Sequence, residues 1–348
     1  MGRCLTLAAL AALAAGLSPA AEKSAPEKPP APAPSQAADP GPFMGEYVGT
    51  FAPAEGEKAA AEAKVFPVKG GEYRVVLRVP PVSEGPTKVR IELSGKPAGA
   101  ELPFAGKAGK VAWSGRIAEK KLTAAADGAG GGKFEMTFAV RRSPTEGARP
   151  PDGAVVLLPQ TEGPPPLEAW TNRKWKALPG GVMEITRGGS NSIRKFGDVK
   201  LHLEFRVPLE PGRGGQGRGN SGVYLMGRYE VQVLDSFGLK PRKGDCGAIY
   251  GVAVPRVNAC LPPLRWQTYD VTFRAPRVNA EGKLIEPGRM TVDHNGIRVH
   301  TDVKLTKTTR AGARGLVQVG PLHLQDHGHP VQYRNIWIVE PTEAKPAP

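Results

Sequence analysis

Residues 219–236, which decide the fold class of this chain, read GNSGVYLMGRYEVQVLDS. After Gly227, the apolar residues Val231 and Val233 alternate with the polar residues Glu230 and Gln232. A period of two is typical of a β-strand that buries one face and keeps the other polar. We therefore expect a β-hairpin here, with its polar side chains pointing away from the core.

Short runs of this kind recur through residues 167–340, and no helix-length amphipathic pattern interrupts them. Asp293-His294-Asn295-Gly296 separates two runs and is typical of a tight hairpin turn, because Asn-Gly tolerates positive φ. Many short strands with such turns predict a two-sheet sandwich. The predicted strands are Val199–Val207, Gly222–Met226, Arg228–Leu234, Thr268–Phe273, Met290–Val292, Ile297–Val299, Leu316–Val319, Leu322–Gln325 and Tyr333–Val339.

Residues 43–159 have a different character. Runs such as Tyr73–Val79 and Phe134–Val140 alternate and are punctuated by Gly and Pro, which predicts a small antiparallel β-domain. No catalytic or ligand-binding motif indicates its role. Residues 160–166 are predicted to form a Pro-rich linker. The chain is therefore expected to be all-β, with this domain followed by a sandwich over residues 167–340.

The composition agrees with this interpretation. The 348 residues include 44 glycines and 36 prolines, which argues against a helical bundle because both residues destabilise helix interiors. A hydrophobic fraction of 40% supports a buried core. The 47 Lys and Arg residues exceed the 33 Asp and Glu residues, and the net charge of +14 permits acidic partners.

Residues 1–21 resemble a secretory signal, with Arg3 before an apolar run and small residues at 18–21. A retained N-terminal anchor is the alternative. Residues 22–42 are predicted to be a Pro/Ala-rich disordered tether, and residues 341–348 a tail. No later stretch is long and apolar enough for a membrane helix. We expect a secreted or periplasmic protein without a membrane span in the mature chain.

Removal of the leader leaves two cysteines, Cys246 and Cys260. Two cysteines in an oxidising compartment can pair, so we predict a disulfide between them. Buried free thiols or a reactive thiol are the alternatives. Because two cysteines alone make a poor metal site, we predict no metal there.

The spacing of Glu230, Gln232 and Asp235 is the strongest catalytic pattern. Asp235 has the wrong parity to share a face with Glu230 in a regular strand, but one bulge after Val233 would restore it, and bulges are common beside active sites. Glycosidic bond cleavage commonly uses two carboxylates in one groove. We therefore expect Glu230 and Asp235 to share a groove, with the Gln232 amide between them.

Other polar residues are candidates for sugar binding. The strand at 199–207 carries His202, Glu204 and Arg206 on one face, although a solvated outer face with a Glu–Arg pair is equally consistent. Trp266 could stack on a sugar ring or belong to the core. Residues 210–219 form a Gly/Arg loop, which we interpret as a mobile rim rather than a nucleic-acid site.

Residues 325–330 add a second cluster. His327 suits proton transfer near neutral pH, and the adjacent Asp326 could orient it. The alternatives are a metal site that includes His323, and a turn in which Asp326 caps backbone amides.

Taken in order, these motifs resemble the 3-keto-disaccharide hydrolase domain family. The resemblance implies a concanavalin A-like jelly roll with a concave sugar-binding groove, and hydrolysis of 3-keto-disaccharides or 3-keto-glycosides. The N-terminal β-domain lies outside it. The matching segments are Phe196–Asp198, His202–Arg206, Gly219–Gly222, Tyr229–Ser236, Cys246–Tyr250, Trp266–Asp270, His294–Gly296, Gly320–Gly328 and Arg334–Trp337.

We hypothesise that Glu230 is the base or nucleophile, Asp235 the acid partner, and His327 a proton shuttle. Gln232 and Asn220 would contact the substrate. Cleavage could proceed by elimination, because a 3-keto group acidifies the proton on C2, or by direct displacement. The alternatives are a lectin-like carbohydrate-binding module and a basic scaffold that binds acidic polysaccharide. We expect a carbohydrate partner, no nucleic acid and no cofactor, with a divalent metal as a variant of the enzyme hypothesis.

Overall fold

The computed structural model describes residues 40–309 and 312–341. Within them the chain consists of strands and turns, with two short 3-10 helices, η1 (Val82–Glu84) and η2 (Gly215–Gly217). The predicted all-β class is confirmed. No helix in the described part of the chain is both long and apolar enough to span a membrane. The predicted leader, most of the tether and most of the C-terminal tail lie outside the described residues.

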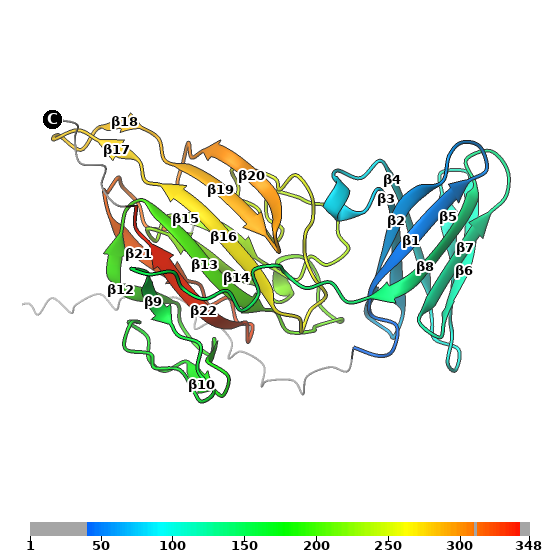
Figure 1. The fold of residues 1–348 in the computed structure, drawn as a ribbon, viewed down its shortest axis with the longest axis horizontal. Coiled ribbons are helices and arrows are strands. Elements are labelled where there is room, and N and C mark those ends of the chain that lie inside the picture. Colours follow the sequence, from blue (N-terminus) through cyan, green and yellow to red (C-terminus); the bar gives the residue numbers. More distant parts are fainter. Residues whose placement is uncertain (1–39, 310–311, 342–348) are drawn as a thin grey trace, which may run out of the picture. The chain divides into compact units, whose positions relative to one another are not determined.

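The N-terminal part is a closed barrel of eight strands in sequential order (Figure 1). Closure arises because the first strand pairs with both the second and the last, for example Tyr47 with Ala63 and with Phe138. Pairing on both sides leaves no open edge. The strands are β1 (Gly45–Pro53), β2 (Ala59–Pro67), β3 (Tyr73–Val79), β4 (Val89–Gly95), β5 (Leu102–Ala108), β6 (Val111–Ala118), β7 (Lys121–Ala126) and β8 (Gly132–Ala139).

Two further sheets form the sandwich. The larger has the order β10-β11-β22-β13-β16-β19-β20, with β9 also paired to β22, and the smaller has the order β12-β21-β14-β15. Their strands are β9 (Val155–Leu158), β10 (Lys176–Leu178), β11 (Val182–Glu184), β12 (Ser190–Phe196), β13 (Val199–Arg206), β14 (Ser221–Leu225), β15 (Tyr229–Val233), β16 (Gln267–Arg274), β19 (Arg289–His294), β20 (Ile297–Lys304), β21 (Gly320–Leu324) and β22 (Gln332–Val339). A separate ribbon joins β17 (Arg277–Val278) to β18 (Leu284–Glu286).

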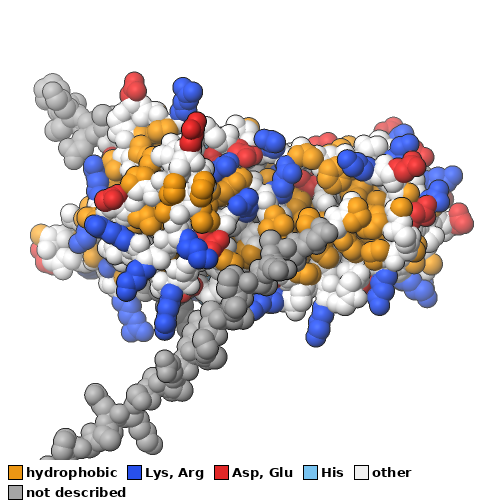
Figure 2. All heavy atoms as spheres, turned by 90° about the horizontal axis from the view of Figure 1, so that it is seen from below, with side chains coloured by type: hydrophobic (Ala, Val, Ile, Leu, Met, Phe, Trp, Pro, Cys, Tyr) orange, Lys and Arg blue, Asp and Glu red, His pale blue; other side chains and the backbone are white. Residues whose placement is uncertain are grey.

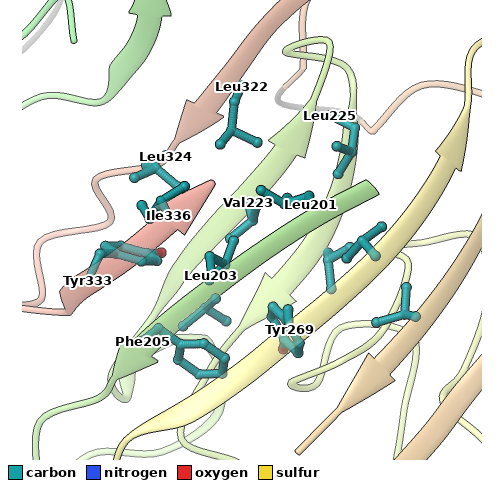
Figure 3. Close-up of a cluster of buried hydrophobic side chains, with 14 of the residues drawn as sticks. Leu201, Leu203, Phe205, Val223, Leu225, Tyr269, Leu322, Leu324, Tyr333 and Ile336 are labelled. Atoms are coloured by element: carbon teal, nitrogen blue, oxygen red, sulfur yellow. The ribbon is translucent and has the colours of Figure 1, made fainter. Parts of the chain in front are cut away.

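The core lies between these two sheets, where alternate residues of each strand meet (Figure 3). In that view, β13 contributes Leu201 and Leu203, β14 contributes Val223, and β21 contributes Leu322 and Leu324. All five side chains are buried. Because neighbouring residues in a strand point to opposite faces, the residues between them face away from this core.

Three sequence predictions can be compared with the strands directly. The turn at Asp293–Gly296 is confirmed: Asn295 and Gly296 have φ of 53° and 74°, and His294 pairs with Ile297. The predicted strand Leu316–Val319 is wrong, because those residues form no strand and Leu316 and Val319 are exposed. Val155–Leu158, which we had placed in the N-terminal domain, pairs with β22 of the large sheet.

Basic side chains are spread over much of the surface shown in Figure 2, with fewer acidic side chains between them. This distribution matches the net charge of +14.

Candidate active site

The outer face of the small sheet carries the candidate site. Val231 and Val233 of β15 are buried in the core, so Glu230 and Gln232 point to the opposite face, as the alternation predicted. Tyr224 of β14 lies directly opposite Glu230 in the strand register. Three polar side chains from two neighbouring strands therefore meet on one face.

A cavity of about 330 Å³ opens over these residues. Its volume lies within the range of small-ligand pockets. Strands supply one side of the cavity, and the loops before β14 and after β15 and β21 supply the remainder. The lining residues are Gln216, Asn220, Tyr224, Glu230, Gln232, Tyr250, Gln325 and His327.

Glu230 is the only acid among the residues that line this cavity. Its side chain is 3% exposed, and burial raises its pKa to about 7, although a hydrogen bond with Tyr224 acts in the opposite direction. Gly222 provides room for it, because a Cβ at Gly222 would lie 2.3 Å from Glu230 Oε1. A carboxyl group with this pKa can accept and return a proton near neutral pH.

A network of amides holds the side chain of Gln232, the next residue of β15 on the same face as Glu230. Gln232 Nε2 donates to Gln216 Oε1 at 2.9 Å and to the Gly244 carbonyl at 3.3 Å. Asn220 Nδ2 donates to the Gln216 carbonyl at 2.7 Å. The buried Gln232 Oε1 has no hydrogen-bond partner among the described residues. The bonds from Nε2 fix the Gln232 amide at the wall of the cavity.

Asp235 does not line this cavity, which corrects our expectation that it shares a groove with Glu230. The strand ends at Val233. The Asp235 carboxylate is buried and accepts a hydrogen bond from Arg218 Nε at 2.6 Å, while its other oxygen accepts one from the Phe237 amide. Asp235 compensates a buried guanidinium and is positioned for a structural role.

Of the histidine cluster, the structure places His327 in the cavity and leaves Asp326 outside it. Asp326 accepts hydrogen bonds from the amides of Gly188 at 2.8 Å and Gly328 at 2.7 Å. It therefore caps the turn, which was one of our alternatives. His323 Nδ1 lies 2.9 Å from Asn191 Oδ1, also outside the cavity lining.

His202 and Glu204 lie on the far side of the sandwich from Glu230. They alternate with core residues of β13, which belongs to the other sheet. His202 Nδ1 contacts Asp270 Oδ1 at 2.6 Å, and Glu204 accepts hydrogen bonds from Arg334 and from the Gly147 amide. Both side chains are fully buried. Burial acts to raise the pKa of Glu204, but hydrogen bonds from His202, Asn335 and the Gly147 amide outweigh it and lower the pKa to about 2. They are not placed for the predicted sugar contact.

Arg206 and Trp266 occupy the same far face. Arg206 pairs with Gln332, and its guanidinium lies 4.8 Å from the Trp266 ring centroid. Arg334 approaches the same ring to 4.1 Å. Two guanidinium groups therefore contact the Trp266 ring, which we expected to stack on a sugar.

Four lining residues were missed by the sequence interpretation: Gln216, Tyr224, Tyr250 and Gln325. Tyr224 could have been found, because it shares the polar parity of its strand. Gln216 and Tyr250 lie in loops, where no periodicity indicates which way a side chain points.

The predicted disulfide is not formed in this structure, where Cys246 and Cys260 are buried free thiols. Their sulfur atoms lie within 4.8 Å of each other and of a ring nitrogen of His294. Residues distant in sequence are thus brought together, and His294 was not part of our cysteine prediction.

Comparison with known proteins agrees with the sequence motifs. A family model described as the 3-keto-alpha-glucoside-1,2-lyase-like domain matches residues 162–339. A solved structure of a candidate glycosyl hydrolase from Parabacteroides distasonis ATCC 8503 is 33% identical, covers 55% of this chain and 84% of that chain, and has a TM-score of 0.49. A second from that organism is 18% identical, covers 53% and 93%, and has a TM-score of 0.38. The sequence matches no curated protein.

Proposed function

Since the chain belongs to the 3-keto-alpha-glucoside-1,2-lyase-like family, we propose that it cleaves the glycosidic bond of a 3-keto sugar by elimination across C1 and C2. Water then adds to the unsaturated product, so that the net reaction is hydrolysis. Glu230 is the base. The observation that carries this proposal is a single buried carboxyl group, with a pKa raised to about 7, in a sugar-sized cavity.

The single acid favours elimination over displacement. Displacement at C1 by the common glycosidase mechanisms uses two carboxyl groups about 5–9.5 Å apart across the scissile bond. Asp235 is the nearest acid in sequence, but it is paired with Arg218 and does not line the cavity. Elimination needs one base, because the 3-keto group already makes the C2 proton acidic.

The proposed steps balance with the residues in the cavity. The Glu230 carboxylate takes the proton from C2, the electron pair of that bond forms the C1–C2 double bond, and the C1–O bond breaks. His327 gives a proton to the departing oxygen. Water then adds its oxygen to C1 and gives one proton to His327, and protonated Glu230 returns a proton to C2. Gln232 and Asn220, held in place by Gln216, line the cavity and orient the ring.

The test compares a 3-keto-disaccharide carrying deuterium at C2 with its unoxidised parent, using mass detection. We expect cleavage of the keto sugar alone, and slower cleavage with deuterium at C2 than with hydrogen there, because elimination breaks that bond. Equal rates for the two labelled forms would contradict elimination. Saturable binding of both sugars without any product would contradict catalysis and favour the lectin-like alternative.

A further inference from the structure

A second cluster of reactive side chains lies inside the sandwich, separate from the residues that line the candidate active site. Cys246 belongs to the loop after β15, Cys260 to the segment before β16, and His294 to the end of β19. One ligand atom from each lies within 4.8 Å of the other two. All three side chains are buried, with exposed fractions of 2%, 1% and 0%.

The hydrogen bonds of His294 determine which of its nitrogens is available. Nε2 lies 3.0 Å from Gln267 Oε1, which is an acceptor and also receives the Leu261 amide and Asn295 Nδ2. Nε2 must therefore carry the proton, which leaves a lone pair on Nδ1. Nδ1 is buried and has no hydrogen-bond partner among the described residues.

The surroundings of Nδ1 suit a ligand. Metal-binding histidines usually donate their other ring N–H to a neighbouring acceptor, as His294 does to Gln267. Residue 247 has no side chain, and a Cβ there would approach Nδ1 to 3.3 Å. Gly247 thus leaves space beside the lone pair. An unpartnered acceptor in a closed interior costs free energy, so an occupant would remove that cost.

The two thiols complete a soft donor set. Lys64 Nζ and Arg141 Nη2 both donate to the Cys260 carbonyl, at 3.3 Å and 3.2 Å. These two contacts hold the Cys260 backbone beside the cluster. Two thiolates and a neutral imidazole would balance the charge of a divalent cation, so the occupied site would carry no net charge into the interior.

We propose that Cys246, Cys260 and His294 bind one zinc ion. Zinc takes Cys sulfur at about 2.3 Å and His nitrogen at about 2.0 Å in tetrahedral geometry, so the three side chains would supply three of its four ligands. The Cys246 loop is hydrogen-bonded to β15, since Gly247 N donates to the Gln232 carbonyl at 3.0 Å. The ion would tie this loop to β19 beneath the strand that carries Glu230.

The test measures metal content and thiols in the full-length protein purified without chelators. We expect about one zinc per chain in the parent protein, and at least tenfold less in Cys260→Ser and His294→Gln. His300→Gln is the matched control: His300 is also buried and contacts the Gly247 carbonyl, but it lies outside the cluster. This variant should keep its zinc. Loading the parent protein with Co²⁺ should produce a thiolate charge-transfer absorption band. This measurement does not depend on whether the variants fold.

The proposal would be overturned if the parent protein bound no zinc after exposure to an excess of the ion. Three titratable thiols in that full-length protein, Cys4 among them, would then indicate a free cysteine pair, and one would indicate the disulfide that the sequence predicted. Zinc retained by both ligand variants would also overturn it, because the ion would then be bound elsewhere.

Discussion

The burial of Glu230 lowers the stability of the folded protein above pH 4.5 and gives the carboxyl group a pKa suited to a base. Its pKa is raised because burial disfavours the charged carboxylate, and the Tyr224 hydroxyl partly compensates by hydrogen bonding. Above pH 7 the folded protein must keep an unfavourable charge in the cavity. Stability from this group is therefore fully present below about pH 4.5 and decreases as pH rises towards 7. The same charge is what makes the residue a base.

The pH dependence of catalysis follows from this shift. We expect kcat/KM for a 3-keto-glycoside to rise with pH through about 7, because only ionised Glu230 is a base, and to fall at higher pH, where His327 loses the proton that it gives. Tyr224→Phe removes a hydrogen bond that favours the carboxylate, so its midpoint should move to higher pH. Tyr229→Phe, a change in the core, should leave the midpoint in place. A midpoint near 4.5 in the parent enzyme would contradict the assignment.

Asp235 and Glu230 should respond differently to neutralisation. Asp235→Asn leaves the buried Arg218 without its charged partner, which we expect to lower the free energy of unfolding by about 3 kcal/mol. The folded fraction should retain its kcat, because Asp235 does not line the cavity. Urea denaturation and kcat corrected for folded protein measure the two effects. A large loss of kcat with unchanged stability would restore Asp235 as a catalytic acid.

At the scale of strands, the sequence predicted those site residues whose direction follows from the alternation of side chains along a strand. Alternation is local, so Glu230 and Gln232 were correctly placed opposite Val231 and Val233. Asp235 was misplaced because the strand ends before it, and its direction depends on Arg218, which lies 17 positions earlier. The barrel's closure depends on β1 pairing with β8, and no local pattern encodes a pairing so distant in sequence.

Short apolar runs also limited the prediction of strands from the sequence. The run Leu316–Val319 has the composition of a strand, yet it forms none and its end residues are exposed. A run of four residues is too short for periodicity to decide between a strand and a loop. The loop residues Gln216 and Tyr250 reach the cavity through chain paths that only tertiary packing determines.

At the scale of the molecule, residues 143–158 join the barrel to the sandwich and pack on the sandwich's large sheet. The Gly147 amide donates to Glu204 at 2.6 Å, Thr145 Oγ1 donates to Asp270 at 2.7 Å, and the Leu157 carbonyl accepts from Trp170 Nε1. β9 also pairs with β22. This connecting segment satisfies buried polar groups that would otherwise lack partners.

Truncation tests that role. A shortened chain that begins at residue 162, where the family match starts, should be less stable than one that begins at residue 141. Loss of the Gly147 donor and of β9 should cost more than about 3 kcal/mol and lower the Tm by at least about 6 °C. Thermal unfolding of both proteins, followed by circular dichroism, measures the difference. Equal Tm values would show that the segment contributes no stability.

The central claim is that Glu230 removes the C2 proton of a 3-keto sugar, and Glu230→Gln tests it most directly. Turnover of a 3-keto-disaccharide should fall by about 10²–10⁴-fold, because the amide cannot act as a base. Substrate affinity and Tm should be maintained, and Glu286→Gln, an exposed carboxyl group on β18, should retain full activity. If folded Glu230→Gln protein turns over the keto sugar at more than a tenth of the parent rate, the account of this site is contradicted.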